Sequence, residues 1–135
     1  MNAALLALIR DRAQYRCEYC RLPQAFSPIP FEIDHIIARK HSGPTTEDNL
    51  AWTCFFCNSA KGPNIAGIDP VSQQIVPLFH PRRQKWSRHF RWEGARLVGR
   101  TRNGRATVVV LAINEPLFVT LRGTLIAAGL FSAEN

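Results

Sequence analysis

The pattern of apolar and polar positions divides the chain into short helices and strands. Residues 3–13 and 114–128 repeat apolar side chains at roughly helical intervals, which predicts helices that bury one face. Residues 31–37 and 49–53 are short runs rich in β-branched and apolar side chains, and they predict two strands. A short helix is predicted over residues 58–62, where glycine and proline end it.

The carboxyl half has a less regular pattern. Residues 71–79 predict only an extended segment, whereas residues 89–99 predict a β-hairpin. Alternation in this hairpin places three large apolar side chains on one face: Phe90, Trp92 and Leu97. Residues 101–113 have strand composition in part, but Thr101 is a suitable helix cap, so we favour a helix.

Length and composition are those of a globular protein. The 135 residues are 46% hydrophobic and 20% charged, which supports a buried core. They predict one domain over residues 1–135, with a core at 12–62 and an extension at 63–135. No run approaches the ~20 apolar residues of a membrane-spanning helix. The apolar start lacks the preceding basic segment of a signal peptide, so we expect a cytoplasmic protein.

Positive charge is concentrated in one segment. The chain has a net charge of +7, and residues 82–105 contribute nine basic side chains against the single acid Glu93. The basic residues are Arg82, Arg83, Lys85, Arg88, Arg91, Arg96, Arg100, Arg102 and Arg105. Because the arginine fork suits bidentate phosphate contact, the segment predicts a nucleic-acid-binding surface. A solvated basic face and an acidic protein partner are the alternatives.

All four cysteines lie in two pairs with metal-ligand spacing: Cys17, Cys20, Cys54 and Cys57. Two thiolates three positions apart can converge on one ion, and two such turns complete a tetrahedral zinc site. Four thiolates leave no open position on the ion, so this zinc would be structural. A redox pair, disulfides and unligated thiols are the weaker alternatives, because no βαβ pattern and no export signal accompany the cysteines.

A longer motif surrounds these cysteine pairs. In chain order it comprises Cys17-x-x-Cys20, Asp34-His35-Ile36, Gly43, Asn49-Leu50 and Cys54-x-x-Cys57-Asn58-x-x-Lys61-Gly62. With this order and spacing it resembles the HNH endonucleases, in the branch that carries two zinc-binding cysteine pairs, and the rest of the chain looks similar to small bacterial HNH proteins. The resemblance implies an α+β fold: a ββα-metal core (the His-Me finger) held by the four-cysteine zinc site, with a basic β-hairpin and carboxyl-terminal helices.

The resemblance also implies roles for individual residues. His35 is the expected general base, and Asn49 is expected to orient it. Asp34 and Asn58 are the expected ligands of a catalytic divalent ion. The family often has histidine where this chain has Asn58, so we expect a hard ion such as Mg²⁺ or Mn²⁺. Lys61 is expected to contact phosphate.

Each of these residues also has an ordinary structural explanation. Asn49 and Asn58 are good turn and helix caps, and Lys61 could be a plain surface lysine. Two functions therefore remain: a metal-dependent HNH endonuclease that hydrolyses phosphodiester bonds in DNA, and a zinc-stabilised nucleic-acid-binding module without catalytic activity. One HNH site cuts one strand per engagement, so a double-strand cutter would need a dimer, and the oligomeric state is open.

Overall fold

The computed structural model describes residues 1–134, which form two compact units. Unit 1 contains residues 1–65 together with residues 80–83, and unit 2 contains residues 66–79 and the chain from residue 84 onward. The single domain expected over residues 1–135 stays a prediction. Among the described residues, no helix combines the length and the apolar character needed to cross a membrane.

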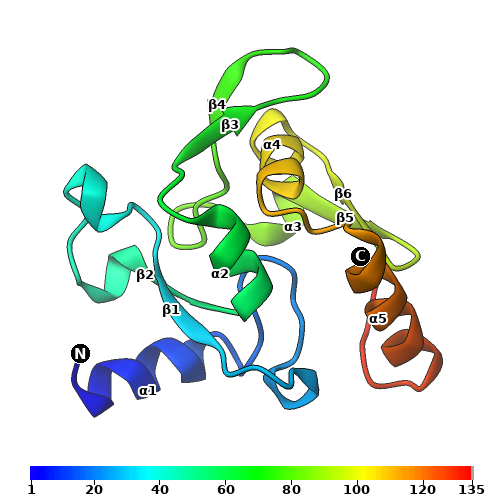
Figure 1. Ribbon diagram of the computed structural model, residues 1–135, viewed down its shortest axis with the longest axis horizontal. Coiled ribbons are helices and arrows are strands. Elements are labelled where there is room, and N and C mark those ends of the chain that lie inside the picture. Colours follow the sequence, from blue (N-terminus) through cyan, green and yellow to red (C-terminus); the bar gives the residue numbers. More distant parts are fainter. Residues whose placement is uncertain (135) are drawn as a thin grey trace. The chain divides into compact units, whose positions relative to one another are not determined.

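Unit 1 is built on two helices and one small sheet (Figure 1). Its elements are α1 (Ala3–Arg12), β1 (Glu32–His35), β2 (Leu50–Thr53) and α2 (Phe55–Lys61), with short 3-10 turns η1 (Gln24–Phe26), η2 (Arg39–His41) and η3 (Glu47–Asn49). Both predicted strands are confirmed, and so is the amino-terminal helix. The predicted helix at 58–62 begins earlier, at Phe55, because the second cysteine pair itself forms its first turn.

β1 and β2 pair in antiparallel register, with Asp34 opposite Ala51 and His35 opposite Leu50. Every residue of β2 is buried, whereas in β1 Glu32 is exposed, Asp34 is buried, and Ile33 and His35 are half-buried. Consecutive strand side chains point to opposite faces, so Asp34 is buried while His35 remains half-buried. The sheet therefore separates the two residues of the Asp-His step, as the sequence predicted.

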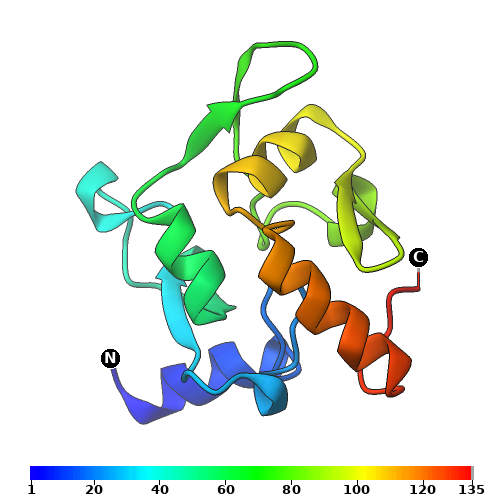
Figure 2. The ribbon, with the colours of Figure 1, turned by 45° about the vertical axis from the view of Figure 1, so that its right-hand side comes forward.

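α2 completes a ββα arrangement by packing against β1 (Figure 2). The helix begins after Cys54, whose sulfur accepts a hydrogen bond from the Cys57 amide at 3.4 Å. The backbone amides in the first turn of a helix have no carbonyl partner within the helix, and a side chain that accepts a hydrogen bond from one of them supplies the missing partner. The cysteine pair thus caps the helix as well as presenting two sulfurs, and the predicted α+β, ββα-metal class is confirmed.

Unit 2 has three helices and two hairpins. Its elements are β3 (Ala66–Ile68), β4 (Ile75–Pro77), α3 (Trp86–His89), β5 (Phe90–Glu93), β6 (Arg96–Gly99), α4 (Arg102–Val110) and α5 (Pro116–Ala127). The predicted hairpin and both predicted helices are confirmed. β4 lies within the segment 71–79 that was predicted to be extended, whereas β3 and the short helix α3 were missed. Three or four residues are too few to establish a period.

The core of unit 2 contains the apolar face of the β5–β6 hairpin. Phe90, Trp92 and Leu97 are each at most 5% exposed, as the alternation predicted. The rings of Phe79 and Phe90 meet edge-on at 5.1 Å between centroids, and Phe131 meets Trp92 in the same way at 5.3 Å. Aromatic contacts of this geometry add to the free energy gained by burying the rings.

α4 lies very close to the strand before it because two glycines remove the side chains that would intervene. Thr101 caps the helix by accepting from the Gly104 amide at 3.1 Å. A Cβ atom at Gly104 would lie 2.1 Å from the carbonyl oxygen of His89, and one at Gly99 would lie 2.3 Å from the Arg105 nitrogen. The helix favoured for residues 101–113 is confirmed as α4, and the close approach of the backbone requires glycine in its first turn.

Gly104→Ala should destabilise the protein, although alanine is the better helix former by about 1 kcal/mol. We expect the free energy of unfolding to fall by ~1–3 kcal/mol, because the new methyl would overlap the backbone at His89. Gly123→Ala in α5 is the matched control: its Cβ would meet nothing nearer than 3.9 Å. That change should stabilise by roughly 0.5–1 kcal/mol in urea unfolding. Equal effects of the two substitutions would contradict the close approach.

Candidate functional site

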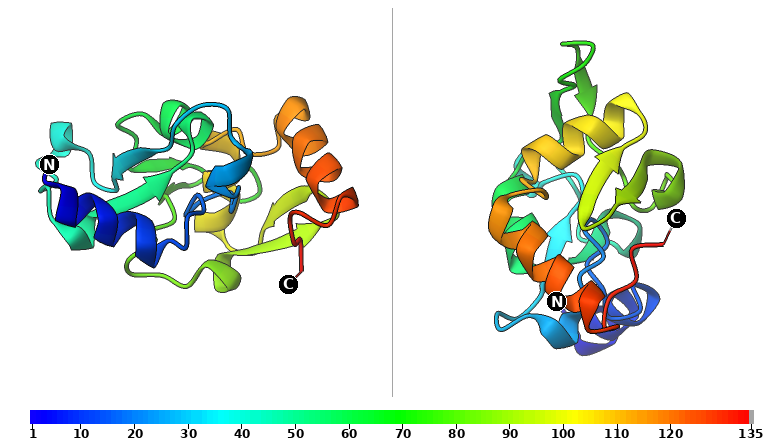
Figure 3. Two further views of the ribbon diagram at one scale, coloured as in Figure 1. Left: turned by 90° about the horizontal axis from the view of Figure 1, so that it is seen from below. Right: turned by 90° about the vertical axis from the view of Figure 1, so that its right-hand side faces the viewer.

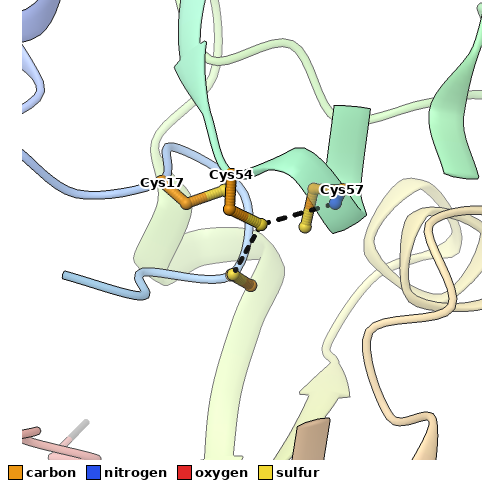
Figure 4. A group of neighbouring side chains, drawn as sticks. Cys17, Cys54 and Cys57 are labelled. Atoms are coloured by element: carbon orange, nitrogen blue, oxygen red, sulfur yellow. Dashed lines mark hydrogen bonds between the residues drawn. The ribbon is translucent and has the colours of Figure 1, made fainter. Parts of the chain in front are cut away.

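The four cysteines converge on one buried point in unit 1. Their sulfur atoms all lie within 4.8 Å of one another, and those of Cys20 and Cys54 are 3.8 Å apart. Figure 4 shows the sulfurs of Cys17, Cys54 and Cys57 directed toward one another from separate parts of the chain. A tetrahedral zinc with Zn–S bonds of ~2.3 Å requires sulfurs about 3.8 Å apart. The cluster therefore fits the structural zinc site that the spacing predicted.

Hydrogen bonds among the cysteines shift the pKa values of Cys17, Cys20 and Cys57. Burial raises the pKa of the Cys17 thiol, but hydrogen bonds from Cys20, Cys54 and Cys57 outweigh burial and bring this pKa well below its ordinary value. The pKa values of Cys20 and Cys57 rise well above theirs, chiefly through hydrogen bonds with Cys17. Four buried thiolates would repel one another without a positive charge among them, and a bound zinc would supply that charge.

A buried polar network lies beside the cysteines. Asp34 accepts a hydrogen bond from the Tyr19 hydroxyl at 2.8 Å and an ion pair from the Lys61 ammonium at 3.1 Å. Lys61 also donates to the carbonyl oxygens of His35 and Ile36, both at 3.2 Å. Lys61 is 1% exposed and Asp34 is 4% exposed. The ammonium thus fixes the backbone at the end of β1, where His35 begins the loop.

His35 lies half-buried at the end of β1, and its imidazole hydrogen-bonds across the following loop. Its Nε2 lies 2.8 Å from the Thr45 hydroxyl, across the loop between β1 and β2. Partial burial lowers its pKa below the ordinary histidine value, and the positive charge of Arg39 lowers it further. The neutral imidazole is therefore the form present at neutral pH.

Asn49 acts on the loop and not on the imidazole itself. Its amide oxygen accepts from the Ile37 nitrogen at 2.9 Å, and its amide nitrogen donates to the carbonyls of Ile37 and Pro44 at 3.0 and 2.8 Å. These bonds hold both ends of the loop, and Thr45 follows Pro44 directly. The orientation of His35 by Asn49 stays a prediction, and these bonds would allow it only indirectly, through the loop that carries the Thr45 hydroxyl.

Gly43 has a physical reason to be glycine in this loop. A Cβ atom there would lie 1.7 Å from the Ile37 carbonyl oxygen. The chain thus crosses over the residues that follow His35 at a distance that no other residue type allows.

Comparison with known families agrees with this geometry. Residues 17–64 match the family model described as HNH endonuclease. Residues 17–64 are therefore similar to an HNH domain. The match begins at the first zinc-site cysteine and ends just after α2, so it covers the cysteines, both strands and the helix. No curated protein and no solved structure matched the chain.

A catalytic divalent ion fits the HNH domain less well than zinc fits the cysteines. Both oxygens of Asp34 already accept hydrogen bonds, and burial raises its pKa even though Lys61 opposes the rise. An ion at Asp34 would share one buried carboxylate with an ammonium, and the two cations would repel. The Asn58 amide nitrogen donates to the Glu32 carboxylate at 2.5 Å. Asp34 and Asn58 therefore do not form a ready pair of ligands for Mg²⁺ or Mn²⁺.

The basic residues of the predicted nucleic-acid surface divide into two groups. Seven are exposed: Arg83, Lys85, Arg88, Arg91, Arg96, Arg100 and Arg102. Arg82 pairs with Glu18 in unit 1, and burial, with Arg12 nearby, lowers its pKa to about 10. Arg105 forms a bidentate pair with Asp69 at 2.8 and 2.9 Å in unit 2. Arg82 and Arg105 are therefore each paired with a carboxylate, and the Lys61 ammonium is buried. The nucleic-acid contacts expected of these three residues stay predictions.

Two site residues that sequence reasoning missed lie inside the first cysteine pair. Glu18 accepts from the Trp52 amide at 2.7 Å as well as from Arg82, and Tyr19 bonds Asp34. Both side chains are buried. Their position between two metal ligands was the only signal in the sequence. A turn around a buried metal site leaves few side chains facing solvent, so this position could have predicted that Glu18 and Tyr19 are buried.

Zinc should be required for unit 1 to fold. We expect elemental mass spectrometry to find one zinc ion per chain of the parent protein. The Cys57→Ser variant should contain no zinc, and unit 1 of this variant should no longer show a cooperative unfolding transition. The physical reason is that structural zinc contributes a large share of folding free energy, ~10–16 kcal/mol in small zinc domains. Ser59→Ala, an exposed position on the same helix, is the control. A Cys57→Ser protein that folds with full stability and no zinc would contradict the assignment.

Lys61→Met should destabilise the protein strongly, because it leaves the buried Asp34 carboxylate without its cation. We expect a loss of about 3–5 kcal/mol in denaturant unfolding, measured without added Mg²⁺. Asp34→Asn should cost less in the Lys61→Met background than in the parent. Lys40→Met, at an exposed lysine, is the control and should change stability by no more than ~0.5 kcal/mol. If the stability of the Lys61→Met variant were unchanged, Asp34 would not depend on Lys61 for its charge balance and could serve as a metal ligand.

Proposed function

We propose that this protein is an HNH endonuclease that hydrolyses phosphodiester bonds in DNA, with His35 as the general base. The observation that carries the proposal is the position of His35 in a matched HNH domain: half-buried at the end of β1, with a lowered pKa and Nε2 hydrogen-bonded to Thr45. A base that is neutral at pH 7 and held at one nitrogen is prepared to take a proton at the other.

The proposed reaction begins with proton removal from water. When Nε2–H donates to the Thr45 hydroxyl, Nδ1 carries the lone pair that can accept the proton. Lys61 holds the His35 carbonyl oxygen at 3.2 Å, and Asn49 holds the loop that carries Thr45. Lys61 and Asn49 do not touch the reacting atoms in the proposed reaction. They are positioning residues that keep the imidazole oriented.

DNA as the substrate is supported by charge. The seven exposed basic residues between Arg83 and Arg102 meet a single acid in that stretch, Glu93, which pairs with Arg91 at 3.4 Å on the surface. Exposed pairs of this kind are weak, so the positive field persists. A field of that sign attracts a polyanion and makes its binding sensitive to salt. Mg²⁺ or Mn²⁺ is proposed as the catalytic ion on the family resemblance.

The first test is cleavage of supercoiled plasmid in Mg²⁺ or Mn²⁺ by the parent and by His35→Ala. Loss of a general base should slow nicking by ~10²–10⁴-fold while DNA binding persists. His41→Ala is the matched control, since His41 is an exposed histidine in the same loop. An EDTA arm tests the metal requirement, and zinc content measured after EDTA separates loss of the catalytic ion from loss of the fold. Equal nicking by His35→Ala and the parent would overturn the role of His35.

The same assay run against pH should show activity that falls as pH decreases, because the proton acceptor is the neutral imidazole. The pKa of His35 is lowered, so the midpoint of this acid limb should lie below the usual histidine value of ~6.5. Arg39→Ala removes a positive charge that lowers this pKa and should move the midpoint upward. A midpoint that does not respond to Arg39→Ala would show that another group limits the rate.

The second candidate is a zinc-stabilised module that binds nucleic acid without cutting it. The buried ion pair of Asp34 with Lys61 specifically favours it, because that pair occupies a carboxylate that the resemblance assigns to the catalytic ion. Salt-sensitive DNA binding by the parent, with no cleavage in any divalent metal, would support this candidate over the enzyme.

A further inference from the structure

The β3–β4 hairpin of unit 2 has an apolar face that the unit does not cover. Its inner face carries Gly67 opposite Val76, and a Cβ at Gly67 would lie 2.6 Å from the Val110 side chain of α4. The outer face carries two cross-strand pairs, Ala66 with Pro77 and Ile68 with Ile75. The hairpin extends beyond α4 in the right-hand view of Figure 3.

The exposure of this face is high for aliphatic side chains. Ile68 is 54% exposed, Val71 at the turn is 72% exposed, and Ile75 is 77% exposed. A hairpin that packs one face on a helix normally places polar side chains on the other face. The exposed pair Ile68 and Ile75, with the exposed Val71 in the turn that follows β3, therefore indicates a contact with another molecule.

The turn of the hairpin is hydrogen-bonded through Asp69 and carries no unpaired negative charge. Asp69 is the only ionisable residue between residues 66 and 77, and it is fully buried. Its carboxylate accepts from the amides of Val71 and Ser72 at 3.2 and 3.1 Å and from the Arg105 guanidinium. Arg105 thus fixes the turn to α4 and cancels the one charge that would repel a polyanion.

The remaining polar groups of the tip are of the kind that contact DNA. Arg102 at the start of α4 donates to the Gln74 side chain at 3.0 Å, which places an exposed guanidinium beside the hairpin. Gln73 and Gln74 are exposed at the turn. Proteins that bend DNA combine arginine and glutamine in the minor groove with aliphatic wedges that separate stacked bases.

We propose that the β3–β4 hairpin is a DNA wedge, which inserts the Ile68, Val71 and Ile75 side chains against unstacked bases of duplex DNA while Arg102 contacts the adjacent backbone. The proposal rests on DNA as the partner in the proposed function, but it does not depend on cleavage. The charge balance favours DNA over a second copy of the chain, because two chains that each carry +7 repel.

The test uses full-length protein with His35→Ala as the parent, so that no duplex is cut. A short duplex containing 2-aminopurine reports binding by anisotropy and base unstacking by fluorescence. The parent should bind and brighten the probe. Ile68→Thr with Ile75→Thr, which keeps β-branching, should remove the brightening and weaken binding by about tenfold. The salt dependence of DNA binding by this double variant should equal that of the parent, because the two substitutions remove no charge.

Leu117→Thr in α5 is the matched control, since Leu117 is an equally exposed aliphatic residue, 73% exposed, in the same unit. Unfolding midpoints of both variants confirm that the fold is retained. A parent that binds the duplex without brightening the probe overturns the wedge and leaves the nuclease proposal standing, whereas a parent that binds no duplex overturns both. A parent that is dimeric by light scattering and becomes monomeric with the two threonines would assign the face to a second copy, and would also overturn the wedge.

Discussion

Convergence of four cysteine sulfurs is the interaction on which the HNH domain depends. It joins a turn after α1 to the residues that start α2, across an insert that contains β1 and the long loop. The insert is too small to bury a core of its own, and its two strands have only four residues each. A zinc ion bound by the four sulfurs would tie the two ends of the insert together and remove much of the conformational freedom that such a segment would otherwise keep.

The same cysteine turns organise the polar interior. Glu18 and Tyr19, between the first two cysteines, reach the backbone of β2 and the carboxylate of Asp34. Lys61, at the end of the helix that the second pair begins, completes the network from the other side. A buried charge pair gains little net free energy, but breaking it is costly, so such a network selects one arrangement of its members. Here that arrangement determines where the backbone of His35 lies.

Unit 2 uses arginine for two different purposes. Arg105 pairs with Asp69 and so joins the turn of the β3–β4 hairpin to α4. Arg102, three residues earlier, remains exposed beside the same hairpin. One residue type thus supplies both the rigidity of the hairpin and the positive surface around it. The difference follows from the partner within reach, because a guanidinium beside a buried carboxylate is neutralised and one beside a neutral amide is not.

Local pattern was sufficient for much of this protein. Spacing predicted the four zinc ligands, alternation predicted the buried face of the β5–β6 hairpin, and strand periodicity separated Asp34 from His35, because each of these depends on residues close together in the chain. Only the tertiary structure decided which charges face solvent. Lys61 and Arg105 look like surface residues in the sequence, and each is committed to a carboxylate 27 or 36 positions away. No local period encodes a partner at that separation, so the division of the basic residues into structural and free ones appears only when the chain is folded.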